Sequence, residues 1–249
     1  MLSFNALGRY GRLGNQMFQY ASLKGIARHR GYQFTIPASN NHDEWNDHQL
    51  SQCFALDDGI EYMSVPSQSL YQEPYFHFNE ALFNECHDGV DLLGYFQTEK
   101  YFSDIREELL NDFSFKEQFD KPLDSYTALH VRRGDYVNQP QYHPVCSLDY
   151  YNNAIKITGG PIIVMSDDIA WCKENIDADI YLEGTSNVYD LYVMSQADNN
   201  IIANSSFSWW GAWLNNNHDK VVVSPKNWFG EAYSNYNMDD LRPESWIQL

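Results

Sequence analysis

PIIVMSDDIAWCKENIDADIYLE, residues 161–183, combines an apolar run, a helical pattern and a second β-rich run. PIIVMS and DIYLE predict strands, and DDIAWCKENI between them predicts a helix. A strand, a helix and a strand in this order form a β-α-β unit with parallel strands. The stretch therefore predicts an α/β fold in which helices cover both faces of a parallel sheet.

The same alternation extends through the rest of the chain. Further strands are expected at residues 33–36, 91–95, 127–133, 199–204 and 220–225. Further helices are expected at residues 15–29, 103–113, 147–157, 187–197 and 206–217. Residues 37–90 give no regular pattern, and the polar stretch at 116–126 is the expected linker. We therefore expect an N-terminal lobe at residues 1–120 and a C-terminal lobe at residues 121–249.

The chain is strongly acidic, with a formal net charge of -18 over 249 residues. This charge repels nucleic acid and anionic membranes, so we expect no nucleic-acid partner and at most peripheral membrane contact. The sequence has no apolar run of the length of a signal-peptide core or a membrane span, and its four cysteines lack C-x-x-C spacing. These features predict a cytoplasmic protein with reduced thiols, in which any anionic ligand meets locally placed arginines.

The segment LHVRRGDY, residues 129–136, brings polar side chains to the carboxyl end of a predicted strand, where parallel sheets bind ligands. These side chains are His130, Arg132, Arg133 and Asp135. An arginine presents a rigid fork of donors that matches phosphate oxygens. An ion pair between one arginine and Asp135 is the structural alternative, and two arginines permit both roles together.

A second strand end carries hydroxyl groups. In IIANSSFSWWGAWL, residues 201–214, a predicted strand runs into Ser205 and Ser206 at the start of a helix. The free amide N–H groups of a helix N-terminus attract anions. Capping of the helix by one of these serines is the alternative.

Two further loops are candidates for ligand contact. The carboxylates of Asp167 and Asp168 follow a predicted strand and can accept the paired N–H groups of guanine, and capping of the next helix by Asp167 is the alternative. The loop GRLGNQ, residues 11–16, lacks the signatures of a P-loop and of a dinucleotide fold. Its backbone and the side chains of Asn15 and Gln16 can approach a phosphate or a sugar, and a simple turn is the alternative.

Five segments, taken in this order, resemble the alpha-1,2-fucosyltransferase family, which uses GDP-fucose. They are GRLGNQMFQYA (11–21), LGYFQTEKYF (93–102), HVRRGDY (130–136), DLYVMSQA (190–197) and IIANSSFSWWGAWL (201–214). The resemblance implies a two-lobed GT-B glycosyltransferase fold with Rossmann-like parallel sheets and the nucleotide in the cleft. It also implies inversion at the fucose anomeric carbon, no metal and no cofactor, since GDP-fucose is a substrate.

The resemblance assigns roles to the central motif. Arg132 would bind the β-phosphate and neutralise the departing GDP, with Arg133 beside it in the donor site, and His130 would line the nucleotide site. Breaking a glycosyl-phosphate bond gathers negative charge on the leaving diphosphate, so a fixed cation there lowers the barrier. Asp135 either holds an arginine in position through an ion pair, a role we call a brace, or accepts the proton of the attacking hydroxyl. We expect the brace, with the departing phosphate or water taking the proton.

The remaining candidates would contact other parts of the donor. Ser205, Ser206 and Phe207 would hold the pyrophosphate, and Asp167 or Asp168 would read guanine. Asn15 and Gln16, on the facing lobe, would close over the sugar and the phosphate.

Two acidic stretches imitate metal sites. DAD at Asp177 to Asp179 follows a predicted helix and not a strand, so we interpret it as a solvated turn. HDEWNDH, residues 42–48, lacks the spacing of a helical histidine pair and is interpreted as a polar loop. No metal site is therefore expected.

The resemblance thus implies transfer of L-fucose to O2 of a terminal β-galactose on a glycan acceptor. A fucosyltransferase of different linkage or acceptor is one alternative, and an inactive sugar- or nucleotide-binding module is another. The oligomeric state has no signal in the sequence.

Overall fold

The computed structural model describes residues 1–39, 47–57 and 59–249, and the chain divides into two compact units. The first comprises Met1–Glu117 and Tyr236–Pro243, and the second comprises Gln118–Asn235 and Glu244–Leu249. The boundary after Glu117 falls within the stretch expected as a linker. Residues 236–243, which the sequence placed in the C-terminal lobe, pack with the first unit.

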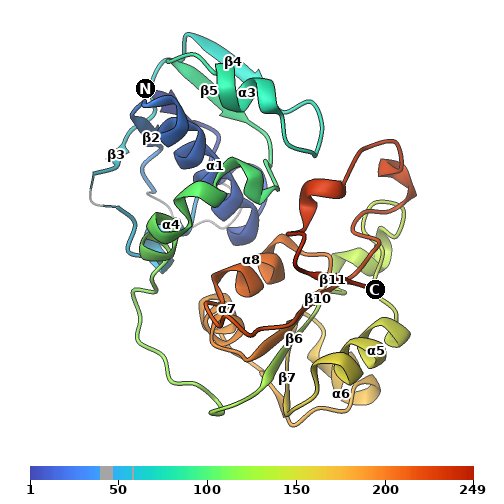
Figure 1. The fold of residues 1–249 in the computed structure, drawn as a ribbon. Coiled ribbons are helices and arrows are strands. Elements are labelled where there is room, and N and C mark those ends of the chain that lie inside the picture. The colour runs from blue at the N-terminus through green and yellow to red at the C-terminus, as the bar shows by residue number, and fades with distance from the viewer. Residues whose placement is uncertain (40–46, 58) are drawn as a thin grey trace. The chain divides into compact units, whose positions relative to one another are not determined.

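In the described residues, the first unit contains a parallel sheet in the order β3-β2-β1-β5-β4. Its strands are β1 (Leu2–Ser3), β2 (Phe34–Ile36), β3 (Glu61–Tyr62), β4 (Ser69–Gln72) and β5 (Val90–Leu93). Its helices include α1 (Leu13–Arg30), α2 (Leu50–Cys53), α3 (Glu80–Glu85) and α4 (Arg106–Asp112). Helix α1 packs against β1 and β2 (Figure 1) and ends at Gly31, whose positive φ of 71° suits glycine.

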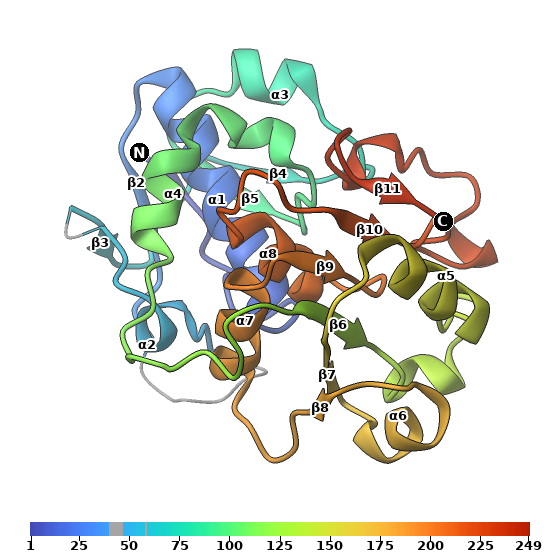
Figure 2. The same ribbon diagram turned by 60° about the horizontal axis from the view of Figure 1, so that its bottom comes forward.

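The second unit contains a parallel sheet in the order β11-β10-β9-β6-β7-β8. Its strands are β6 (Thr127–Val131), β7 (Ile162–Ser166), β8 (Ile180–Tyr181), β9 (Asn199–Ile201), β10 (Val222–Ser224) and β11 (Ile247–Gln248). Its helices include α5 (Leu148–Thr158), α6 (Ile169–Asn175), α7 (Asn187–Ser195) and α8 (Ser206–Leu214). Figures 1 and 2 show α5 and α6 on one side of this sheet and α7 and α8 on the other.

Each face of the second sheet has its own packing. Leu129, Val131 and Val164 pack with Tyr151 and Ala154 of α5 in one buried cluster. On the other side, the indoles of Trp209 and Trp210 in α8 are fully buried. The tryptophans of α8 thus belong to the hydrophobic core, and a ligand contact by this helix can come only from its first residues.

The expected strands and helices of the later half are present, with ends that differ by a few residues. All four cysteines are free. Across the part of the chain that the structure describes, no helix is long and apolar enough to cross a membrane.

Candidate functional site

The candidate site of the second unit lies where three neighbouring strands end. Strand β6 pairs with β7 on one side, with Val131 opposite Ser166, and with β9 on the other, with Leu129 opposite Ile201. The residues that follow these strands therefore meet at one edge of the sheet, as expected for a ligand site in a parallel sheet.

Arg132 lies between two carboxylates. Its Nη2 is paired with Asp135, and its Nη1 lies 2.8 Å from Oδ2 of Asp167. The guanidinium carbon also lies 5.1 Å from the centre of the Tyr136 ring. Gly134 permits the approach of Asp167, because a Cβ at that position would lie 2.4 Å from Oδ2. The structure thus contains the brace expected from Asp135, and Asp167 is a second brace.

Arg133 is held by a different set of partners. Its Nε lies 3.0 Å from Oδ2 of Asp168, its guanidinium stacks over Trp171 at 4.0 Å, and its backbone N–H donates to Oδ1 of Asp167 at 2.9 Å. Oδ1 of Asp168 accepts the backbone N–H of Trp171 at 3.2 Å and so caps α6. The cap considered for Asp167 is therefore supplied by Asp168, because Asp167 turns toward the arginines.

This arrangement affects the expected guanine contact. Each carboxylate oxygen of Asp167 and Asp168 already has a protein partner. Since a carboxylate oxygen has two lone pairs, either residue retains acceptor capacity for a base. A guanine ring would share these carboxylates with the arginine segment.

His130 is buried and neutral at physiological pH. Burial, assisted by the charge of Arg132, lowers the pKa of His130 to about 3. Its ring centroid lies 5.5 Å from that of Phe207 at the start of α8. Its Nδ1 has no hydrogen-bond partner in the described part of the chain. A buried imidazole with an unpaired nitrogen can make one hydrogen bond to a ligand.

Helix α8 begins without a side-chain cap. Ser205 occupies the N-cap position but makes no capping hydrogen bond, and the first turn contains no acidic residue. Capping by Ser205, the alternative considered from the sequence, is therefore wrong. The N–H groups of the first turn, which includes Ser206 and Phe207, are available to an anion.

Tyr136 and Asn204 link the arginine segment to α8, and the sequence interpretation did not select either. The Tyr136 hydroxyl donates to the Asn204 carbonyl at 3.2 Å, and burial raises the pKa of Tyr136 to about 12. The buried Asn204 amide donates to the carbonyls of Pro144 and Trp228, at 2.9 Å each. The sequence feature that could have indicated these two residues is their position: Tyr136 ends HVRRGDY, and Asn204 precedes the two serines.

Two predicted donor residues, Asn15 and Gln16, lie in the first unit and have different surroundings. Asn15 is partly exposed, and its Oδ1 accepts from Nε2 of Gln97 at 2.7 Å. Gln16 is fully buried, and its amide bonds to the backbone of Asp47 at 3.4 Å and of Gln49 at 2.8 Å. The expectation that Gln16 closes over a ligand is therefore not met in this structure, because its amide holds the loop together.

The two acidic stretches that imitate metal sites are DAD at residues 177–179 and HDEWNDH at residues 42–48. Oδ2 of Asp179 accepts the Ile162 N–H at 2.7 Å in the segment between α6 and β8. Residues 42–46 of HDEWNDH lie outside the described residues. Within residues 1–39, 47–57 and 59–249, no three His, Cys, Asp or Glu side chains are grouped so as to hold a metal ion.

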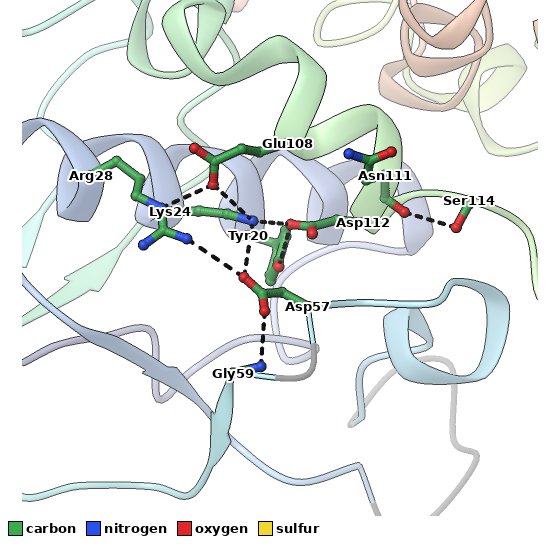
Figure 3. A network of polar contacts seen from close by, with 9 residues as sticks. All are labelled: Tyr20, Lys24, Arg28, Asp57, Gly59, Glu108, Asn111, Asp112 and Ser114. Carbon is green, nitrogen blue, oxygen red and sulfur yellow. Dashed lines mark hydrogen bonds and ion pairs between the residues drawn. The ribbon is translucent and has the colours of Figure 1, made fainter.

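A polar pocket of about 620 Å³ lies in the first unit, lined by residues of α1, α4 and the segment after α2. Figure 3 shows Lys24 among three carboxylates there. Its buried Nζ lies 2.6 Å from Asp112 and 3.5 Å from both Asp57 and Glu108, and the Tyr20 hydroxyl donates to Asp112 at 2.7 Å. Because the ammonium and the buried carboxylate satisfy each other, we assign this network a structural role.

A family model described as glycosyl transferase family 11 matches residues 3–249. The O-antigen biosynthesis glycosyltransferase WbnK of Escherichia coli is 32% identical, over 96% of this chain and 98% of WbnK. An Escherichia coli alpha-1,2-colitosyltransferase is 30% identical over 96% of each chain. Galactoside alpha-(1,2)-fucosyltransferase 2 of Oryctolagus cuniculus is 27% identical, over 86% of this chain and 67% of its own length. These matches confirm the family resemblance found in the five sequence segments.

The structure is similar to a solved fucosyltransferase. NodZ from Bradyrhizobium has a TM-score of 0.55 and 10% sequence identity, over 85% of this chain and 92% of NodZ. The likeness concerns the fold, and it confirms the GT-B-like prediction.

Proposed function

The chain belongs to glycosyl transferase family 11, and from this premise we propose that it transfers L-fucose from GDP-β-L-fucose to O2 of a terminal β-galactose, with inversion. The names of the relatives support this reaction, since one is a galactoside alpha-(1,2)-fucosyltransferase. A NodZ structure was determined after soaking with GDP-fucose, which supports a GDP-sugar donor for this fold.

The observation that carries the proposal is that Arg132 follows β6 while the uncapped start of α8 follows β9, the strand paired with β6. Departure of GDP places negative charge on the diphosphate, and a guanidinium and a helix N-terminus both stabilise such charge. Arg132 and Arg133 share their surroundings with three carboxylates, so the cluster is not a free cationic patch. We infer that Asp135 and Asp167 orient Arg132, and that the diphosphate approaches its remaining donors.

The acceptor hydroxyl must lose a proton as the new bond forms. Asp135 is engaged with Arg132, and this contact favours the brace over a role as base. An oxocarbenium-like transition state needs only a weak nucleophile, so a departing phosphate oxygen or water can take the proton.

The test is an incubation of the purified chain with GDP-fucose and a β-galactoside, followed by linkage analysis of the product by NMR. We expect fucose on O2, and no product with the matched 2-deoxygalactoside. Calorimetry should give tighter binding of GDP than of UDP. Equal binding of UDP, or fucose on the 2-deoxygalactoside, would overturn the donor or the linkage respectively.

We also propose that turnover needs no divalent metal, because Arg132 and the start of α8 supply positive charge at the diphosphate. The rate should be unchanged by EDTA. Loss of activity that is restored by Mg²⁺ or Mn²⁺ would contradict this.

A second candidate function is the transfer of a different sugar through the same α-1,2 linkage. The relative named alpha-1,2-colitosyltransferase is 30% identical over nearly the whole chain, which supports colitose as an alternative donor sugar. The kcat/KM values for GDP-fucose and for the corresponding colitose donor, measured with the same galactoside, distinguish the two candidates.

A further inference from the structure

The motif LGYFQTEKYF, residues 93–102, has no role in the reaction described above, yet its backbone is strained. Phe96 has a φ of 51°, and among the described residues it is the one non-glycine residue with a positive φ. Such a conformation persists only where surrounding structure enforces it, and it often occurs at functional sites. The Phe96 side chain is fully buried, with its ring 5.9 Å from that of Phe4 and 5.7 Å from that of Tyr101.

Glu73, directly after the neighbouring strand β4, fixes this turn. Its carboxylate accepts the N–H of Tyr95 at 2.7 Å and the N–H of Phe96 at 3.0 Å. Gly94, with a φ of 155°, permits the contact, because a Cβ there would lie 2.4 Å from Cβ of Glu73. The Gly94 carbonyl accepts from the Gln19 amide at 2.9 Å, which ties the turn to α1. The turn is therefore held from two directions.

The turn places Gln97 against Asn15. Nε2 of Gln97 donates to Oδ1 of Asn15 at 2.7 Å. This bond determines which way the Asn15 amide points, because its oxygen is committed to Gln97 and its nitrogen faces away. Gly11 makes room for that nitrogen, since a Cβ at Gly11 would lie 2.1 Å from Nδ2.

Asn15 is thus presented as a hydrogen-bond donor. Its side chain is partly exposed, and Nδ2 has no acceptor in the described part of the chain. A ligand group that contacts this nitrogen must be an acceptor, such as a phosphate or sugar oxygen.

We propose that Gln97 and Glu73 are positioning residues for Asn15: Glu73 fixes the turn, and Gln97 orients the Asn15 amide so that its N–H groups meet an oxygen of the nucleotide-sugar donor. The inference rests on the proposed function, which supplies the donor. It gives the hydrogen bond between the strained turn and the loop at residues 11–16 a role in donor binding.

The test is the isosteric variant Gln97→Glu, with Gln33→Glu at an exposed position of the same unit as the matched control. A glutamate cannot donate to Oδ1, so the Asn15 amide turns its N–H groups inward and presents its oxygen to the donor. We expect the KM for GDP-fucose to rise about 10-fold or more, as for the loss of one hydrogen bond to a charged group, with the acceptor KM unchanged. The control should keep wild-type values.

Asn15→Ala gives an independent check. It removes the N–H groups offered to the ligand without adding a charge, so its donor KM should rise at least as much as that of Gln97→Glu. The double variant should lose little more than either single variant, because both changes remove the same contact. Additive losses, or a Gln97→Glu variant with wild-type donor KM, would overturn the inference.

Glu73→Gln tests the turn itself. It keeps one acceptor oxygen but places an NH₂ group against the other backbone N–H, so donor KM should rise while the acceptor KM stays constant. Wild-type kinetics in this variant would remove Glu73 from the inference. Failure of the proposed function is distinguishable, since the unmodified chain would then neither bind GDP nor form a fucosylated product.

Discussion

At the residue scale, Arg132 and Arg133 are adjacent but have different partners. Arg132 contacts Asp135 and Asp167 at the strand end, whereas Arg133 is stacked on Trp171 and paired with Asp168. We therefore expect Arg132→Ala to remain folded and to lower kcat/KM about 100-fold or more, because a donor to the leaving group is lost.

The matched variant Arg133→Ala should keep more activity than Arg132→Ala, because Arg133 is stacked on Trp171 and paired with Asp168, whereas the leaving group is assigned to Arg132. Steady-state kinetics and thermal denaturation of the two variants check the assignment. If Arg133→Ala is folded but inactive while Arg132→Ala is unfolded, the roles assigned to the two arginines must be exchanged.

His130 makes stability depend on pH. Its pKa is about 3 in the folded chain against an ordinary value of 6.5, so below pH 6.5 the unfolded chain binds a proton that the folded chain does not. The free energy of unfolding should therefore fall as pH decreases from 6.5 toward 3, by up to about 1.4 kcal/mol per pH unit from this residue.

Urea denaturation of the wild type and of His130→Gln at pH 7 and pH 5 measures this contribution. The variant should lose less stability on acidification, whereas His87→Gln, at an exposed position, should follow the wild type. Parallel pH profiles for the wild type and His130→Gln would contradict the expectation.

At the scale of elements, helices α1 and α4 are joined by a buried ion pair. Lys24 of α1 lies 2.6 Å from Asp112 of α4, and burial beside Asp112 raises the pKa of Tyr20, whose hydroxyl remains a donor (Figure 3). Lys24→Met should lower the free energy of unfolding by about 3–5 kcal/mol, because it leaves the Asp112 carboxylate buried without its cation.

Chemical denaturation checks this value, with Lys116→Met as the matched control. Lys116 is exposed and donates to the Ser51 carbonyl, so its loss should cost less than about 1 kcal/mol. Equal effects of the two variants would show that the buried pair does not join the helices.

At the scale of the whole molecule, the two units differ in how far the sequence predicts them. Strands β6 and β7 of the second unit are buried almost throughout, and buried parallel strands appear as continuous apolar runs. In the first unit, β3 is two residues long and exposed, and Leu70 of β4 is 59% exposed, so neither strand gives such a run. Helices α2 and α3 are too short to establish a period.

The same difference applies to the site. The sequence predicted which residue types lie at the strand ends, because strand ends are set by the local pattern. It did not predict that Asp168 caps α6 or that Gln16 turns inward, because the direction of a loop side chain depends on neighbours distant in sequence, such as Gln49 for Gln16.

The return of the chain to the first unit near its C-terminus also depends on tertiary contacts, and the sequence pattern therefore did not predict it. Oδ2 of Asp240 accepts the Phe78 N–H at 3.0 Å, and Oδ1 lies 2.5 Å from Nζ of Lys100, while the rings of Phe76 and Tyr236 stack at 4.8 Å. Because the Lys100 side chain is half exposed, the ion pair contributes little, and the hydrogen bond to Phe78 is the larger effect.

Asp240→Ala should therefore lower the free energy of unfolding of the first unit by about 1–3 kcal/mol, since a part-buried N–H loses its acceptor. Asn235→Ala, just before the segment and exposed, should change it by less than about 0.5 kcal/mol. Limited proteolysis of both variants adds a local readout, because release of the segment should make residues 236–243 easier to cleave in Asp240→Ala alone. If the two variants unfold and are cleaved alike, this aspartate does not hold the returning segment, and the aromatic pair at Tyr236 becomes the contact to test next.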